Sequence, residues 1–258
     1  MTTALGTVRT VRTVRTMIVL ALDTTTRAGS VAVTDEDHVL ALLPGDDSRT
    51  HGERLPAEIA AALDRAGVSR HQLDLLAVAA GPGGFTGLRI GLAAVQGLAM
   101  TLNKPVAGVS ALDALAEQVG STQARIIVPW MDAQRGDVFA TVIDARSKAT
   151  LEDAVAERPA AVLDRWRSHL AGRHVVFIGD AVTRDQALLQ NAGNPQWHIR
   201  RPDPLAPQIA LLARRLAEQG KAGPPHALIP IYVRRSDAEI EREMRRAAEE
   251  RGGVRSKG

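Results

Sequence analysis

The chain has 258 residues, of which 45% are hydrophobic, enough to bury one large core or two modest ones. It contains no cysteine, which excludes disulfides, thiolate metal sites and a cysteine nucleophile and is typical of a cytoplasmic protein. Arg9, Arg12 and Arg15 account for the whole net charge of +3, so the rest of the chain is neutral by count and predicts no broad basic face.

Residues 1–16 precede the first predicted element and contain three copies of the triplet Thr-Val-Arg. A three-residue repeat matches the packing period of neither a helix nor a half-buried strand. An arginine-rich segment without acids is also compatible with an organelle transit peptide. We expect a disordered extension or a misassigned start, with Met17 as the natural first residue.

The first predicted elements are three short strands at 17–23, 30–34 and 39–43, separated by polar turns. Strands this short and closely spaced predict an antiparallel meander. A helical stripe over 55–66, closed by Gly67, follows.

A glycine turn, Gly81-Pro82-Gly83-Gly84, comes directly after a predicted buried strand at 75–80. Thr86 then stands where a helix N-cap belongs, ahead of a predicted helix at 87–102. Such a turn seats either an anion or another backbone. It matches neither the Walker nor the Rossmann glycine pattern, which argues against those two nucleotide sites.

The remaining elements repeat this order. A strand at 106–109 and a helix at 111–118 are followed by strands at 126–131, 138–143 and 174–178 and by helices at 158–171, 182–192 and 207–219. The order predicts an α/β fold with a duplicated βββαβαβα architecture. We expect a first domain over 17–110, a less regular second domain over 111–235 and a charged helical tail over 236–258. No segment reaches the ~18 uninterrupted apolar residues of a membrane span, so no membrane partner is expected.

Four segments carry a family resemblance: residues 20–26 (LALDTTT), 81–91 (GPGGFTGLRIG), 130–139 (WMDAQRGDVF) and 230–234 (PIYVR). They resemble the TsaB (YeaZ) family. The resemblance implies the fold of the actin/hexokinase/Hsp70-like (ASKHA) superfamily. It also implies a non-catalytic subunit that binds and activates TsaD, which transfers threonylcarbamoyl to N6 of adenosine 37 in tRNAs reading ANN codons.

The resemblance implies partners as well: TsaD, the ATPase TsaE, tRNA within the complex and, without TsaD, a second copy of the chain. TsaD-like proteins hold a metal with a His-x-x-x-His pair, and the corresponding positions here are Ala111 and Leu115. Neither side chain can ligate a metal. We therefore expect no catalytic residue and no metal site in this chain, with ATP and the metal belonging to partner subunits.

The family resemblance also implies a remnant of a nucleotide-binding site. In kinases of this superfamily the first hairpin carries an aspartate and hydroxyls that meet Mg²⁺ and phosphates. Asp23, Thr24 and Thr25, with Gly83 and Gly84 of the glycine turn, keep that pattern. The same threonines also suit a plain hydrogen-bonded hairpin, so nucleotide binding stays open.

The partner surface is expected on two helices. The resemblance implies that His51, Arg54, Leu55 and Ile59 on the first helix, and Gly87, Arg89, Gly91 and Leu98 on the second, face TsaD. Small residues on one helix face permit close approach of another helix, but they equally permit tight packing on the parent sheet. Both interpretations remain open from the sequence.

Two other classes of function also remain open. One is an enzyme, either an ATP-dependent phosphotransferase or a peptidase of the same superfamily, although no serine elbow, cysteine or metal pair supports a peptidase. The other is a tRNA-binding module, for which salt-dependent binding of tRNA by the chain alone would be evidence.

Overall fold

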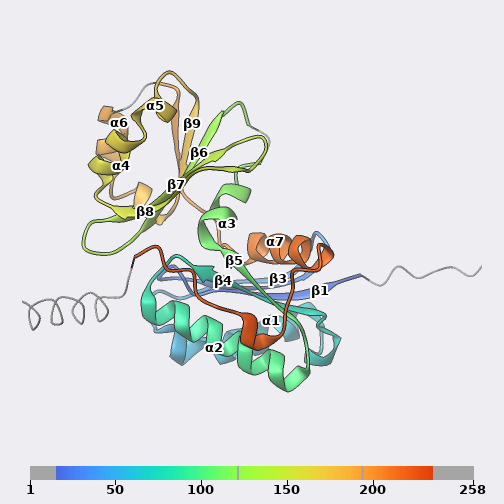
Figure 1. Ribbon diagram of the computed structural model, residues 1–258. Helices are drawn as coiled ribbons and strands as arrows, with labels where there is room; N and C mark the ends of the chain where they lie inside the picture. Colours follow the sequence, from blue (N-terminus) through green and yellow to red (C-terminus); the bar gives the residue numbers. More distant parts are fainter. Residues whose placement is uncertain (1–15, 121, 193–194, 235–258) are drawn as a thin grey trace, which may run out of the picture.

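The computed structural model describes residues 16–120, 122–192 and 195–234, which form two lobes (Figure 1). The first lobe contains a five-stranded mixed sheet in the order β3-β2-β1-β4-β5. Its strands are β1 (Ile18–Asp23), β2 (Ser30–Asp35), β3 (His38–Pro44), β4 (Leu75–Gly81) and β5 (Val106–Ser110). β1 pairs antiparallel with β2 and parallel with β4, which confirms the predicted meander and crossover.

The second lobe repeats this topology. Its strands are β6 (Ile126–Asp132), β7 (Val138–Asp144), β8 (Thr150–Glu157), β9 (Val175–Ile178) and β10 (Trp197–Arg200). They lie in the order β8-β7-β6-β9-β10, with β6 antiparallel to β7 and parallel to β9. Two copies of one mixed sheet confirm the predicted duplicated α/β architecture.

Helices cover both faces of the first sheet (Figure 1). α1 (His51–Ala66) and α2 (Phe85–Leu102) lie on its outer face, while α3 (Ala111–Glu117) and α7 (Ala206–Glu218) lie between the lobes. On the far side of the second sheet lie α4 (Pro159–Arg165), α5 (Arg167–Leu170) and α6 (Gln186–Ala192). The part of the chain that the structure describes also contains three single 3₁₀ turns: η1 (Arg70–Gln72), η2 (Asp180–Val182) and η3 (Pro225–Ala227).

The ends of the two outer helices follow from their capping residues. α1 begins at His51, ahead of the predicted 55, because Thr50 and Glu53 form a capping box. It ends where Gly67 takes a left-handed φ of 65° and its N–H bonds the last carbonyls. α2 begins after Gly84, so the prediction of Thr86 as N-cap is wrong: Thr86 lies inside the first turn.

One apolar core joins the lobes. It combines Val19 and Ala77 of the first sheet, Ile127 of the second, and α3 and α7 between them. α7 packs on β1, β2, β4 and β5 of the first lobe although it follows the second sheet in sequence. The expected second domain, 111–235, therefore does not correspond to one lobe, because α7 returns to the first.

Several predicted elements differ in detail. β8 and β10 were not predicted, and the helix expected over 158–171 is broken at Trp166, whose φ of −103° and ψ of 18° are not helical. The expected extension 1–16, apart from residue 16, and the tail 236–258 lie outside the described residues.

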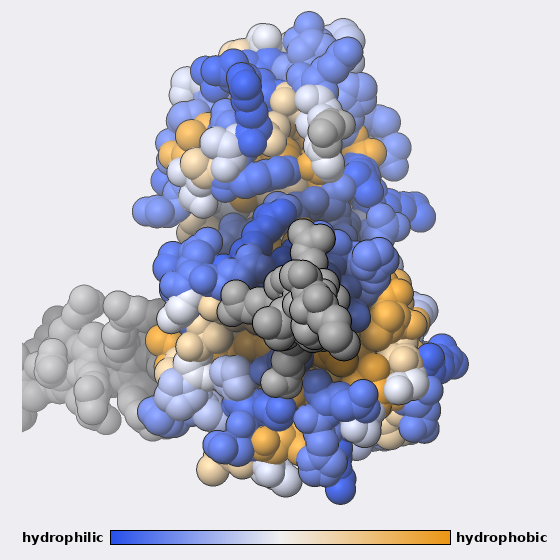
Figure 2. All heavy atoms as spheres, turned by 90° about the vertical axis from the view of Figure 1, so that its right-hand side faces the viewer, coloured by the Kyte–Doolittle hydropathy of each residue, from blue (hydrophilic) through white to orange (hydrophobic). Residues whose placement is uncertain are grey.

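Polar side chains cover most of the face shown in Figure 2, with apolar ones gathered on the lower, first lobe. Among the described residues, α2 is the single helix long and apolar enough to cross a membrane. Its Leu88, Leu92, Val95 and Ala99 are buried in the first lobe, as in a core-covering helix.

Candidate functional site

The turn between β1 and β2 begins with a buried aspartate whose two carboxylate oxygens both accept hydrogen bonds from its neighbours. Asp23 is 2% exposed. Its Oδ1 accepts hydrogen bonds from the backbone N–H of Thr25 at 2.8 Å and from the Thr25 hydroxyl at 2.6 Å, and its Oδ2 accepts one from the Thr26 hydroxyl at 2.9 Å. Asp23, Thr25 and Thr26 thus form a hydrogen-bonded turn, whereas the buried hydroxyl of Thr24 has no hydrogen-bond partner among the described residues.

The glycine turn seats a backbone. A Cβ on Gly83 would lie 2.5 Å from Cβ of Thr25, closer than side chains approach. The Gly84 N–H donates to the Thr25 carbonyl at 3.2 Å. The two turns are therefore in direct contact, and of the two alternatives left open by the sequence the structure shows the backbone seat.

The next two glycines bring α2 against the same β1–β2 turn. A Cβ on Gly87 would lie 2.3 Å from the Thr24 carbonyl oxygen, and one on Gly91 would lie 2.1 Å from the Thr24 hydroxyl. Thr24 is itself 1% exposed. The expectation that Gly87 and Gly91 face a partner is wrong for this fold, because both face the chain's own turn.

His51 and Arg54 brace this turn from the start of α1. Nε2 of His51 donates to the Thr26 carbonyl at 3.0 Å, and Nδ1 accepts from the Arg54 guanidinium at 2.8 Å, which assigns the neutral imidazole. Partial burial, and then the Arg54 charge, lower the pKa of His51. Arg54, 3% exposed, also binds both carboxylate oxygens of Glu58 and the Ala28 carbonyl. Both residues were expected at a partner surface, but their hydrogen-bond partners are internal.

The other expected interface residues divide between core and surface. Leu55 and Ile59 are buried in the core beneath the first sheet, and Leu98 is partly buried against it. Arg89 is exposed and places its guanidinium 3.9 Å from the ring centre of Phe85. The expected helices are present, but most of the expected residues lie on their inward faces.

The outward faces of α1 and α2 consist largely of small and apolar residues. Those classed as exposed include Pro56, Ala57 and Ala60 on α1 and Ala93, Gly97 and Met100 on α2. A Cβ on Gly97 would meet nothing within 4 Å, and Met100 is 74% exposed. We call this surface the α1–α2 face. Sequence reasoning missed it because small residues occur on both sides of α2.

The corresponding turn of the second lobe, between β6 and β7, carries a compact charge cluster. The Asp132 backbone N–H donates to Asp180 at 2.9 Å, and the Asp132 carboxylate accepts from Arg184 at 2.6 Å. Hydrogen bonds and charge from Asp185 and Asp132 raise the pKa of Arg184, while burial and the Asp132 charge raise the pKa of Asp180. The negative charge of Asp132 is thus matched by a protein cation.

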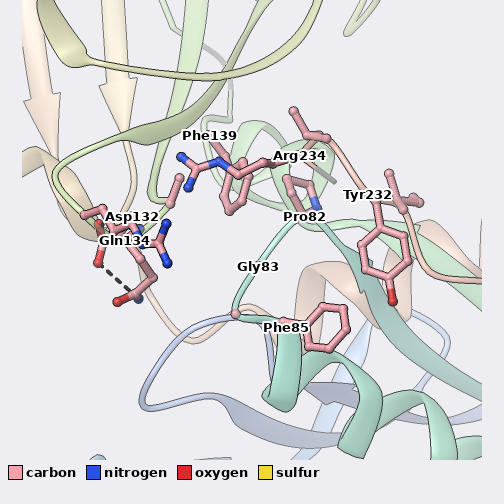
Figure 3. A pocket seen from close by; sticks show the side chains of 13 residues that line it. Pro82, Gly83, Phe85, Asp132, Gln134, Phe139, Tyr232 and Arg234 are labelled. Atoms are coloured by element: carbon pink, nitrogen blue, oxygen red, sulfur yellow. Dashed lines mark hydrogen bonds between the residues drawn. The ribbon is translucent and has the colours of Figure 1, made fainter. Parts of the chain in front are cut away.

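Two cavities lie where the lobes meet. A cleft of about 540 Å³ is lined by the β1–β2 turn, His51, the start of α2, and Asp132, Gln134 and Asp180. A smaller pocket of about 270 Å³ lies between the glycine turn, the β6–β7 turn and residues 231–234 (Figure 3). The site has the position of an interlobe ligand cleft, with its two turn aspartates already bound by protein groups.

The two positions that correspond to metal-binding histidines in TsaD-like proteins lie in α3. Ala111 is 0% and Leu115 is 1% exposed, and both belong to the core shared by the lobes. Within residues 16–120, 122–192 and 195–234, no group of three His, Asp or Glu side chains is arranged to hold a metal.

This chain is similar to known proteins in its fold and along most of its sequence. The family model described as TsaD, tRNA N6-adenosine threonylcarbamoyltransferase, matches residues 41–242. A protein of Bacillus subtilis (strain 168) named tRNA threonylcarbamoyladenosine biosynthesis protein TsaB is 28% identical over 232 residues, 86% of this chain and 96% of that protein. The chain belongs to the TsaB (YeaZ) family.

Further relatives agree with that membership. The Escherichia coli (strain K12) protein of the same TsaB name is 36% identical over 130 residues, which cover 48% of this chain and 53% of that protein. The solved structure of YeaZ from Pseudomonas aeruginosa superposes with a TM-score of 0.69 at 27% identity, covering 84% of this chain and 99% of that one. The TsaB fold is thus shared over nearly the full length of the solved relative.

Proposed function

We propose that this chain is a non-catalytic subunit in the formation of threonylcarbamoyladenosine in tRNA, and that it binds and activates a TsaD-type transferase. The observation that carries the proposal is the state of α3. Where the catalytic relatives are expected to hold a metal, this chain has Ala111 and Leu115, two alkyl side chains in the shared core. Alkyl side chains at these positions contribute to the core and cannot ligate a metal.

The interlobe cleft supports the same division of labour. The Asp23 carboxylate is occupied by hydrogen bonds from its own turn, and Asp132 is paired with Arg184. An incoming metal-bound phosphate would have to displace these partners. We therefore propose that the nucleotide and the metal are held by partner subunits, in the cytoplasm, where tRNA and the ATPase TsaE complete the machinery.

The α1–α2 face supports the proposed partner contact. Its small side chains, Ala60, Ala93 and Gly97, let another helix approach closely, and Met100 offers an adaptable apolar contact. The same face can pair with a second copy of the chain when the transferase is absent. A symmetric pair of this kind is the commonest form of homodimer.

The test places a large charge on this face. Because Ala93 is exposed, its replacement by arginine does not disturb the core, and the Ala93→Arg variant should fold with an unchanged melting temperature. A guanidinium at the centre of a close helix contact should abolish co-purification with the organism's TsaD protein and stop threonylcarbamoylation in the reconstituted system.

The matched control is Ala187→Arg, which adds the same group at an exposed alanine of α6 in the second lobe. It should leave the complex and its activity unchanged. Unaltered binding and activity of the Ala93→Arg variant would contradict the proposed surface. Threonylcarbamoylation by the chain alone, free of other subunits, would contradict the non-catalytic role.

A further inference from the structure

The last described residues, 228–234, cross from the first lobe to the second, and we call this segment the clasp. The chain reaches it after Gly223 pairs with Val106 of the edge strand β5 through two hydrogen bonds of 2.9 Å. The side-chain amide of Gln96 on α2 then donates to the carbonyl of Leu228 at 3.1 Å. Leu228 is 7% exposed and belongs to the core of the first lobe, so the clasp starts from a fixed point.

The clasp next contacts the end of β4. The N–H of Ile231 donates to the carbonyl of Ala80 at 2.7 Å. A Cβ on Gly81 would lie 2.4 Å from the carbonyl oxygen of Ile231, and Gly81 has a φ of 123°, so glycine is required there twice over. The clasp therefore lies directly on the backbone that leads into the glycine turn.

An aromatic stack follows. The rings of Tyr232 and Phe85 lie 5.9 Å apart at an interplanar angle of 27°, and Arg89 covers Phe85. Of the chain's seven aromatic residues these two are the most exposed, at 44% and 40%. Stacked rings attract each other beyond the effect of their buried area, so the pair fastens the clasp to α2.

The clasp then reaches the second lobe. Val233 packs on the shared core, and the guanidinium of Arg234 pairs with the carboxylate of Asp137 in the β6–β7 turn. Asp137 also binds Arg158, a residue of its own lobe, at 3.2 Å. Figure 3 shows Arg234 and Tyr232 on the rim of the pocket between the lobes. Arg234 is thus the clasp's charged contact with the opposite side of the cleft.

The other connection between the lobes is of a different kind. The shared core between them contains small side chains, Ala114 and Ala116 of α3 and Ala206, Ala210 and Ala213 of α7, beside large ones such as Leu112, Leu115 and Ile209. Small side chains offer shallow ridges, over which packed helices can slide in a shear motion. This core can act as a hinge, while Tyr232 and Arg234 of the clasp connect the lobes at the interlobe pocket.

We propose that the clasp holds the two lobes at one fixed angle, so that this chain is locked where a nucleotide-dependent relative would open and close. The lock consists of the Tyr232–Phe85 stack and the Arg234–Asp137 ion pair. The inference is independent of the proposed partner, because it concerns the free chain. Releasing the clasp should allow the lobes to separate about the α3–α7 side and open the interlobe pocket.

The test measures the distance between the lobes by pulsed electron paramagnetic resonance. Because the chain has no cysteine, spin labels can be attached at His71→Cys in the first lobe and Gln190→Cys in the second, both exposed. The otherwise unchanged chain should give one narrow distance distribution. The double variant Tyr232→Ala, Arg234→Gln should lose that narrow distribution and shift to longer distances.

The matched control is Ile229→Ala with Arg158→Gln. It truncates a clasp residue that is 71% exposed and removes the other guanidinium from Asp137, yet cuts no connection between lobes. It should keep the narrow distribution. Circular dichroism establishes that each variant is folded, and the single variant Arg234→Gln, which removes one partly exposed charge, replaces the double variant if that unfolds.

Two results would overturn the proposal. One is a folded clasp variant with the same narrow distribution as the parent, which would show that the shared core alone fixes the lobe angle. The other is equal broadening in the control, which would show that charge around Asp137, and not the connection across the lobes, sets the distribution.

Discussion

At the scale of single residues, the glycines of α2 separate two roles that look alike in sequence. Gly91 and Gly97 lie on one helix, six residues apart. A Cβ on Gly91 would strike the buried Thr24 hydroxyl, whereas one on Gly97 would meet nothing within 4 Å. Side-chain direction, which no pattern of small residues specifies, decides what each glycine does.

This difference predicts opposite effects of the same substitution. Gly91→Ala should destabilise the free protein by about 1–3 kcal/mol, since overpacking forces the buried turn to shift. Gly97→Ala should stabilise it by about 0.5–1 kcal/mol, because alanine costs less backbone entropy in a helix. Chemical denaturation of both variants measures the two values, and equal signs would contradict the assigned directions.

His51 gives the molecule a predicted dependence on pH. Its pKa in the folded protein lies below the ordinary 6.5, through burial and the Arg54 charge, while in the unfolded chain it returns to that value. The unfolded state therefore binds the proton more tightly. The stabilising contribution of neutral His51 is complete above about pH 6.5 and is lost as the pH falls towards the folded value.

The measurement compares unfolding free energies at about pH 7.5 and about pH 5.5. His51→Gln should lose part of the acid destabilisation seen in the parent, because the buried imidazole that resists protonation is gone. His71→Gln, at an exposed position of η1, serves as the control and should follow the parent. If the unfolding free energy of His51→Gln changed with pH as steeply as that of the parent, the assignment of a neutral, hydrogen-bonded His51 imidazole would be refuted.

At the scale of elements, the sequence predicts an element where its apolar period is clear. The strands β1, β4 and β6 are continuous apolar runs, and α1 shows a stripe closed by Gly67, so all four were predicted. β8 lacks such a signal because it is an edge strand without a fully buried residue, and β10 is an edge strand in which polar residues interrupt the apolar ones, unlike the equally short but continuously apolar β9. The candidate site was harder to predict. The sequence indicated its turns, but residue spacing did not specify which side chains hydrogen-bond to one another.

α3 illustrates an element completed by a distant residue. It has seven residues, and the ammonium group of Lys148, from the β7–β8 turn, donates to the carbonyls of Ala116 at 2.9 Å and Val119 at 2.6 Å, beside the end of the helix. The pKa of Lys148 is lowered, because the effect of burial outweighs the opposite effect of the nearby Glu117 charge. A cation at this end satisfies terminal carbonyls and complements the helix dipole.

Lys148→Met is accordingly expected to destabilise the protein by about 2 kcal/mol, since both carbonyls lose a charged donor. The methylene stem is retained, and the left-handed φ of 58° at this position burdens both residues equally. Urea unfolding gives the value. Lys221→Met, at an exposed position, is the control, and an equally small change in both would argue against the capping role.

At the scale of the whole molecule, the interlobe cleft lies beside the turn in which the sequence predicts a nucleotide remnant, but an aspartate in each of its two turns is engaged by protein groups. The chain's own threonines bind Asp23, and Arg184 binds Asp132. A ligand that must first break these contacts binds weakly, and weak binding adds little stability to the folded state.

Magnesium ATP at about 5 mM should therefore raise the melting temperature of the free chain by less than about 1 °C. Differential scanning fluorimetry with magnesium chloride alone as the reference measures the shift. A rise of several degrees that depends on both nucleotide and metal would show that a nucleotide can displace the protein groups bound to Asp23 and Asp132. It would then favour the phosphotransferase alternative.

The return of α7 to the first sheet has a consequence for biosynthesis. Ile209, Ala210 and Ala213 complete the core over one side of strands that were translated much earlier, since Ala213 follows Val19 by 194 positions. While the ribosome is still making the second lobe, that side of β1 and β4 has no cover from its native helix. Folding of the amino-terminal half should therefore finish only once α7 has emerged from the ribosome, and ribosome-bound nascent chains that stop before residue 206 should recruit holding chaperones.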